Sequence, residues 1–150
     1  MTFRIPRSFP AAAAIVAAVA LVAVPGAALG AFGDAPPVVS KVKVSPSKFR
    51  ALKSGSEIAP KGGAVVTFNL SDGGLMTVSF RHATAKGYKP VPGSFTYIGA
   101  YGENEMRIAG RVKSKAGKPP IALKPGRYRV VIKPEASGSR SAFGSFTILK

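Results

Sequence analysis

The chain has 150 residues, with 22 Lys and Arg against six Asp and Glu, which gives a formal net charge of +16. It contains no cysteine, which excludes disulfides and a lipid-modified N-terminal cysteine. One histidine without any cysteine also excludes the usual zinc ligand sets.

The first thirty residues have the layout of a secretory signal peptide. Arg4 and Arg7 form a positive n-region, and an unbroken apolar run follows at 11–24. The run is shorter than the roughly 20 residues that span a bilayer, which favours cleavage over an uncleaved membrane anchor. Small residues place the cleavage after Gly30 or, as second choice, after Ala28. Cleavage removes two arginines and no acid, so the formal charge falls from +16 to +14.

The remaining chain is long enough for one domain that packing alone can stabilise. Residues 31–37 end in a Pro-Pro pair and are predicted to be a disordered lead, so the domain spans 38–150. Period-two alternation predicts about seven short strands, with no convincing helical period. In chain order the extended segments are 38–44, a short edge piece at 49–52, 64–70, 75–81, 93–100, a segment around Met106 and Ile108, 127–133 and 143–149.

Glycine-rich and proline-rich segments separate these strands. The sequence Ser71-Asp72-Gly73-Gly74 is a strong tight-turn signal, and it predicts that the strands on either side form a hairpin. Residues 83–92 and 112–120 are rich in Lys, Gly and Pro, and both are expected to be loops.

A corner is predicted where the chain enters the strand at 127–133. Leu123 precedes a Pro-Gly turn, and Tyr128 follows it as the first inward-facing residue of the strand. This arrangement suggests a tyrosine that packs over the turn while its hydroxyl caps backbone upstream. The predicted core consists of Val66, Phe68, Met76, Val78, Phe80, Ile108, Leu123, Tyr128, Val130, Ile132, Phe146 and Ile148.

Three stretches together resemble bacterial immunoglobulin-like or fibronectin-III-like domains. They are GRV at 110–112, ALKPGRYRVVIKPEASGSRS at 122–141 and SFTIL at 145–149. The likeness is best over roughly the last half of the chain, and it is to single-domain versions in secreted, mostly uncharacterised proteins of high-GC bacteria. It implies an all-β, immunoglobulin-like sandwich of about seven antiparallel strands at the cell envelope or outside the cell. It implies little about a ligand, because such domains serve as spacers, adhesion modules and enzyme accessories.

No set of residues in the sequence supports catalysis, so we expect a protein that is not an enzyme and uses no cofactor. His82 has no nucleophile elbow near it, and it is expected to lie exposed at a strand end. Glu103 and Glu105 would share one face of a strand. Their carboxylates supply too few oxygen ligands for calcium, and the two residues of a glycosidase pair normally come from different elements across a cleft.

The basic residues remain as candidates for binding. Tyr88, Tyr97 and Tyr101 could interleave with them as stacking aromatic residues. Basic side chains gather around one loop and the outward face of the next strand, and these are Lys113, Lys115, Lys118, Lys124, Arg127 and Arg129.

Two functions are compatible with this pattern. The first is a secreted or cell-envelope module with a structural, adhesion or binding role. The alternative is binding of a polyanion, such as an anionic wall polymer or an acidic polysaccharide, by the basic face. A further surface protein is another possible partner, whereas nucleic acid is disfavoured because a secreted protein seldom meets it. Basic strand faces can also serve solubility alone.

Overall fold

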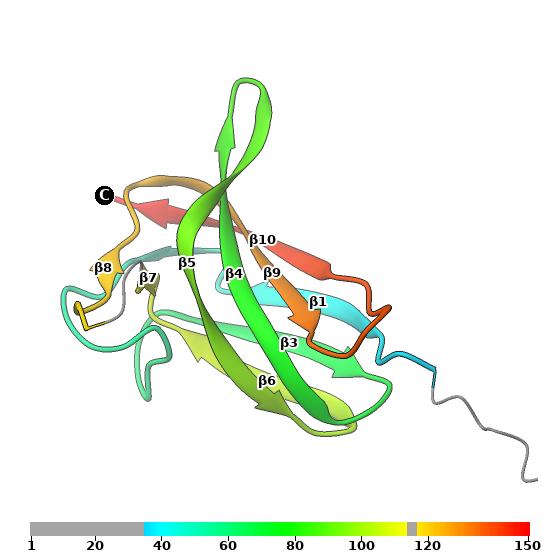
Figure 1. Ribbon diagram of the computed structural model, residues 1–150. Coiled ribbons are helices and arrows are strands. Elements are labelled where there is room, and N and C mark those ends of the chain that lie inside the picture. Colours follow the sequence, from blue (N-terminus) through cyan, green and yellow to red (C-terminus); the bar gives the residue numbers. More distant parts are fainter. Residues whose placement is uncertain (1–34, 114–116) are drawn as a thin grey trace, which may run out of the picture. The chain divides into compact units, whose positions relative to one another are not determined.

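The computed structural model describes residues 35–113 and 117–150 (Figure 1). The predicted signal peptide at 1–30 and most of the predicted lead lie outside the described residues, as does Lys115. Residues 35–37 of the lead carry no regular secondary structure.

The described part of the chain is all-β, with ten strands and no helix. The strands are β1 (Val39–Ser45), β2 (Lys48–Arg50), β3 (Ala64–Leu70), β4 (Gly74–Thr84), β5 (Gly87–Gly99), β6 (Gly102–Ile108), β7 (Arg111–Val112), β8 (Ile121–Ala122), β9 (Gly126–Pro134) and β10 (Ala142–Leu149). The expected seven or so increase to ten partly because β7 and β8 form a small pair at the two ends of the segment expected to be a loop.

Two main sheets share one apolar core. The three-stranded sheet has the order β1-β3-β6, and the five-stranded sheet has the order β2-β10-β9-β4-β5. All neighbouring strands are antiparallel except β2 and β10, which run parallel. Side chains from both sheets pack in the core, as the edge-to-face contact of Phe68 on β3 with Tyr97 on β5 shows, with ring centres 6.0 Å apart.

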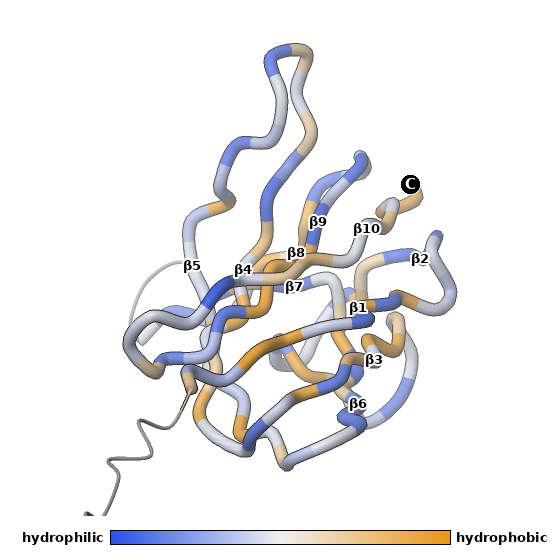
Figure 2. Tube along the Cα trace, turned by 90° about the vertical axis from the view of Figure 1, so that its right-hand side faces the viewer, coloured by the Kyte–Doolittle hydropathy of each residue, from blue (hydrophilic) through white to orange (hydrophobic). Residues whose placement is uncertain are grey.

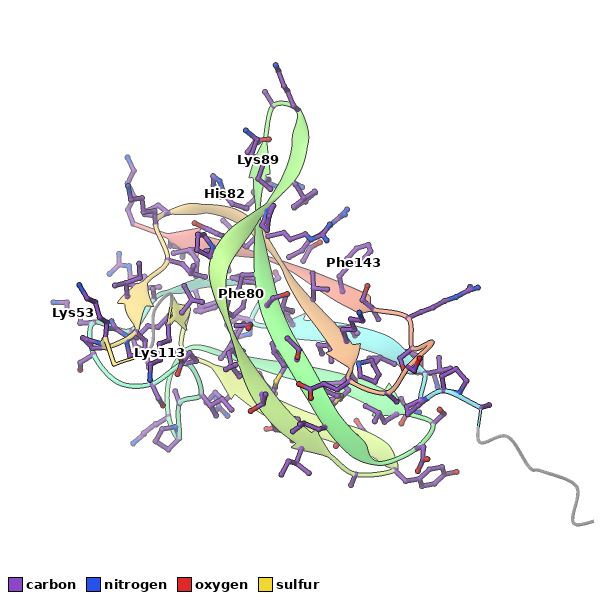
Figure 3. All side chains as sticks on the ribbon, in the orientation of Figure 1. Lys53, Phe80, His82, Lys89, Lys113 and Phe143 are labelled. Carbon is purple, nitrogen blue, oxygen red and sulfur yellow. The ribbon has the colours of Figure 1, made fainter. Side chains whose placement is uncertain are left out.

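Strand periodicity predicts this core correctly. Successive side chains of a strand point to opposite faces, so every second residue of β3 and β9 is buried. All twelve predicted core residues are buried, and Phe80 at the centre is completely inaccessible to solvent (Figure 3). The predicted corner is also present, because the hydroxyl of Tyr128 donates a hydrogen bond of 2.9 Å to the carbonyl oxygen of Lys124.

The prediction of a hairpin around 71–74 is wrong. β3 pairs with β1 and β6, whereas β4 pairs with β5 and β9. The turn between β3 and β4 therefore leads the chain from one sheet to the other. The two glycines suit a sharp turn in either case. Such a turn needs residues that tolerate tight backbone geometry, whether the next strand pairs with the previous strand or joins the other sheet.

The segment 83–92 is not a loop but the outer end of a long hairpin. β4 continues to Thr84 and β5 begins at Gly87, with Arg81 opposite Pro90 and Ala83 opposite Tyr88. The hairpin tip extends beyond the other strands in both views (Figure 1 and Figure 2). β5 is the edge strand of its sheet, and an edge strand accepts prolines because one side needs no hydrogen-bond donors.

Candidate functional site

The positive charge of the domain is unevenly distributed between the two main sheets. The three-stranded sheet carries Lys41, Lys43 and Arg107 together with Glu103 and Glu105, so its charges nearly cancel. The strands of the five-stranded sheet contain no acidic residue and seven basic ones, namely Lys48, Arg50, Arg81, Lys89, Arg127, Arg129 and Lys133. Of the two sheets, the five-stranded one therefore has the charge that favours binding of an anion.

β9 lies inside this sheet and carries arginines on its outward face. Its buried residues alternate with Arg127 and Arg129, which therefore point away from the core. Arg129 is directly opposite Arg81 of β4 on one side and Ser145 of β10 on the other. Like charges directly opposite each other on neighbouring strands repel, so the pair of arginines lowers stability unless an anion lies nearby.

Arg129 is held between two aromatic rings, one from the neighbouring strand β10 and one from β5, which lies one strand further away. Its guanidinium carbon lies 3.9 Å from the ring centre of Tyr88 on β5 and 4.1 Å from that of Phe143 on β10. Figure 3 shows Phe143 beside the five-stranded sheet, and 52% of its surface is exposed. The Nε atom of Arg129 is shielded from solvent and donates no hydrogen bond to the described residues. Its contacts on this face are therefore mainly aromatic.

A hollow of about 170 Å³ opens next to this stack. It is bordered by two basic side chains and by hydroxyl groups from three strands and the segment before β2; its lining residues are Ser47, Lys48, Tyr88, Arg127, Tyr128, Ser145, Phe146 and Thr147. None of the described residues that line it is acidic. The hollow therefore presents hydrogen-bond donors and positive charge to one small volume.

The six basic residues predicted as a site are distributed over different elements. Arg127 and Arg129 lie on β9, and Lys124 lies exposed in the turn before it. Lys113 and Lys118 lie exposed in the segment between β7 and β8. Figure 3 shows Lys113 near β7, away from Lys89 on the projecting hairpin.

The loop that carries Lys113 is fixed at its base by a buried arginine. Arg111 donates hydrogen bonds to the carbonyl oxygens of Leu52 at 2.9 Å, Lys53 at 2.7 Å and Gly55 at 3.1 Å, and also to that of Pro120. Only 8% of this residue is exposed. Arg111 is therefore engaged in holding backbone, and its charge is not available to a ligand.

The three tyrosines considered as stacking residues have different surroundings. Only Tyr88 stacks on a basic side chain. Tyr97 lies half-buried between the sheets, where its hydroxyl donates a hydrogen bond of 2.9 Å to the carbonyl of Glu105. Tyr101 is 79% exposed in the turn before β6.

The acidic and histidine side chains do not assemble into a catalytic or metal-binding arrangement in the part of the chain that is described. Glu103 and Glu105 are both exposed on one face of β6, as expected, with the buried Asn104 between them. His82 is half-buried rather than exposed, because its ring packs 4.8 Å from that of Tyr128. Within 35–113 and 117–150, no three His, Asp or Glu residues lie close enough to hold a metal ion.

Several residues on the outward face of the five-stranded sheet were not predicted from the sequence as site residues. Lys48, Arg81, Phe143, Ser145 and Thr147 come together only through the register of β2, β10, β9 and β4. Period-two alternation correctly placed Phe146 and Ile148 in the core. The same alternation implies that Ser145 and Thr147 point outward.

Comparison with known proteins adds no assignment. No family model matches the chain, and no curated protein is significantly similar to it. Among the described residues there is also no helix long and apolar enough to cross a membrane.

Proposed function

We propose that this protein is a non-enzymatic binding module of the cell envelope or the extracellular space, and that the outward face of its five-stranded sheet binds an anionic polymer. The observation that carries the proposal is the composition of that sheet, whose strands contain seven basic residues and no acidic residue. A surface on which one charge sign predominates attracts and orients a polymer of the opposite sign.

An immunoglobulin-like fold is part of this proposal. The sheet orders β1-β3-β6 and β10-β9-β4-β5 correspond to the A-B-E and G-F-C-C′ orders of such domains. The tyrosine corner at the start of β9 supports the same assignment. The location outside the cytoplasm rests on the predicted signal peptide.

Retention on anionic matrices at rising salt concentration tests the function. The protein, in the form isolated from cells, is applied to immobilised polyphosphate, to polygalacturonate, to purified envelope polymer and to neutral dextran. We expect retention on anionic matrices only, with elution by salt, because release of counterions drives such binding. Each basic contact that is removed should reduce the salt slope by about one.

Two triple variants of equal charge locate the binding surface. The first replaces Lys48, Arg81 and Arg127 on the sheet with Gln, and the second replaces Lys53, Lys113 and Lys118 around the β7–β8 segment with Gln. The sheet variant should elute at a clearly lower salt concentration than the loop variant, while neither melts at a lower temperature than the parent.

Other results would change the proposal. Equal losses would show that only net charge matters, and a larger loss in the loop variant would move the site to the predicted basic loop. No retention on any anionic matrix would contradict polymer binding. The basic residues would then serve solubility, and a structural role or a protein partner would take its place.

A further inference from the structure

A row of three side chains crosses the sheet where β2, β10 and β9 lie side by side. Lys48 of β2 is opposite Thr147 of β10, and Thr147 is opposite Arg127 of β9. Adjacent strands are about 4.8 Å apart, so the backbones of the two basic residues are separated by about 10 Å. The threonine hydroxyl lies between two basic side chains that are both long enough to reach over it.

The hollow described above lies on this row. Both basic residues line it, and so do the hydroxyl-bearing residues Ser47, Ser145, Thr147 and Tyr88. A carboxylate has two oxygens with about four lone-pair sites, and all of these lie close to one plane. A tetrahedral oxyanion has three or more oxygens that point in different directions, so it can use donors arranged around a hollow.

We propose that this hollow is a subsite for one tetrahedral oxyanion, a phosphate or sulfate ester group, of the polymer that the sheet binds. The proposal rests on the proposed function and names the chemical group that is recognised. Lys48 and Arg127 neutralise the charge, and the hydroxyls of Thr147 and Ser145 donate to its oxygens.

Arg129 has a different role in this subsite. Tyr88 belongs to β5, and β4 separates that strand from β9. The stacking of Tyr88 on Arg129, at 3.9 Å, holds the tyrosine at the border of the hollow. Arg129 is therefore a positioning residue, while Arg127 and Lys48 contact the anion.

Titration with small anions tests the subsite separately from the polymer. Inorganic phosphate, dimethyl phosphate, methyl sulfate and acetate are added at constant ionic strength, and backbone amide shifts are followed by NMR. We expect phosphate or sulfate probes to shift the amides of Ser47, Lys48 and Thr147 with a saturating curve, and acetate to have little effect. The diester and sulfate arms show which source of the group binds best.

Matched substitutions identify the contacts. Lys48→Gln and Thr147→Val should each weaken binding of the best probe by about threefold to tenfold, which is the range for the loss of one hydrogen bond of typical strength. Lys61→Gln removes the same charge from an exposed position outside the five-stranded sheet and should leave the affinity unchanged. Tyr88→Phe keeps the ring on Arg129 and removes only the hydroxyl, so any loss that it causes belongs to the hollow.

The outcomes separate the two proposals. Shifts that are spread over the domain would overturn the subsite even if the polymer is retained. An effect of acetate equal to that of phosphate, or an effect of Lys61→Gln equal to that of Lys48→Gln, would overturn it as well. Saturable binding at the hollow without polymer retention would support the subsite and overturn the proposed function. A melting curve for each variant confirms that it is folded.

Discussion

The guanidinium of Arg129 lies 3.9 Å from the ring centre of Tyr88, although 41 positions separate the two residues in the chain. Strand β4 brings them together, because it pairs with β5 on one side and with β9 on the other. Phe143 contacts the same guanidinium from β10. This contact joins the outer part of the projecting hairpin, one residue pair from its tip, to the centre of the five-stranded sheet.

The first prediction concerns Tyr88→Ala. Loss of the stacked ring should reduce the free energy of unfolding by about 1 to 2 kcal/mol, which is the range for a partly desolvated cation–π contact. It should also speed amide hydrogen exchange in the hairpin at 84–90, because the stack no longer restrains it. Tyr101→Ala is the matched control, since that ring is 79% exposed and its loss should leave both quantities unchanged. Equal exchange rates in the two variants would show that the stack does not restrain the hairpin.

The second prediction concerns the tyrosine corner. Tyr128→Phe keeps the buried ring but removes the donor to the carbonyl of Lys124, so the free energy of unfolding should fall by about 1 to 3 kcal/mol. Tyr128→Ala also removes the packing against Phe146 and His82 and should cost about 3 to 5 kcal/mol. Denaturant unfolding measures both. A Tyr128→Ala protein with the parent's unfolding curve would contradict the corner as a stabilising element.

The third prediction is a pH dependence that follows from the same residue. Burial raises the pKa of Tyr128 above its ordinary value of 10.0, because the ionised phenolate is poorly solvated inside the protein. The folded protein then holds this proton more tightly than the unfolded chain does. The stabilising contribution is complete below pH 10.0 and is lost as the pH rises through the raised value.

Comparison with Tyr128→Phe isolates this effect from the titration of the many lysines. The difference in free energy of unfolding between the parent and the variant should be constant below pH 10.0 and should shrink or change sign above it. Denaturant unfolding at several pH values provides the measurement. A constant difference across the whole range would show that the hydroxyl does not titrate differently in the folded state.

Residues that follow strand periodicity could be placed from the sequence. Arg127 and Arg129 alternate with buried residues in β9, so their outward direction followed from the pattern alone. The corner was also predictable, because Tyr128 follows a Pro-Gly turn and its partner, the carbonyl of Lys124, is only four positions away.

Contacts between distant strands could not be predicted in the same way. A turn signal at 71–74 fixes a sharp change of direction but not the sheet that the next strand joins. The stack of Tyr88 on Arg129 and the row from Lys48 to Arg127 both depend on the register of several strands. A slip of one residue would turn these side chains to the opposite face, and local patterning in the basic segments does not determine that register.

The fourth prediction concerns the buried Arg111, whose partners leave no mark in the sequence because all of them are backbone carbonyls. Arg111→Lys keeps the charge but offers a single ammonium group, which cannot reach the carbonyls of Leu52, Gly55 and Pro120 together. Loss of one or two charge-assisted hydrogen bonds should reduce the free energy of unfolding by about 2 to 4 kcal/mol.

Arg107→Lys on β6 is the control for Arg111→Lys, because Arg107 is half-buried and forms no comparable set of bonds to backbone within the described residues. Hydrogen exchange should further show that Arg111→Lys loosens the segment 51–58, where three of the four carbonyls lie.

The same variant tests where the polymer binds. Because β7 begins at Arg111, Arg111→Lys shows whether retention on anionic polymer depends on the β7–β8 segment. Retention equal to that of the parent is expected, since the proposed binding surface is the outward face of the five-stranded sheet. A loss of retention in a protein that is still folded would instead place the site at the β7–β8 loop.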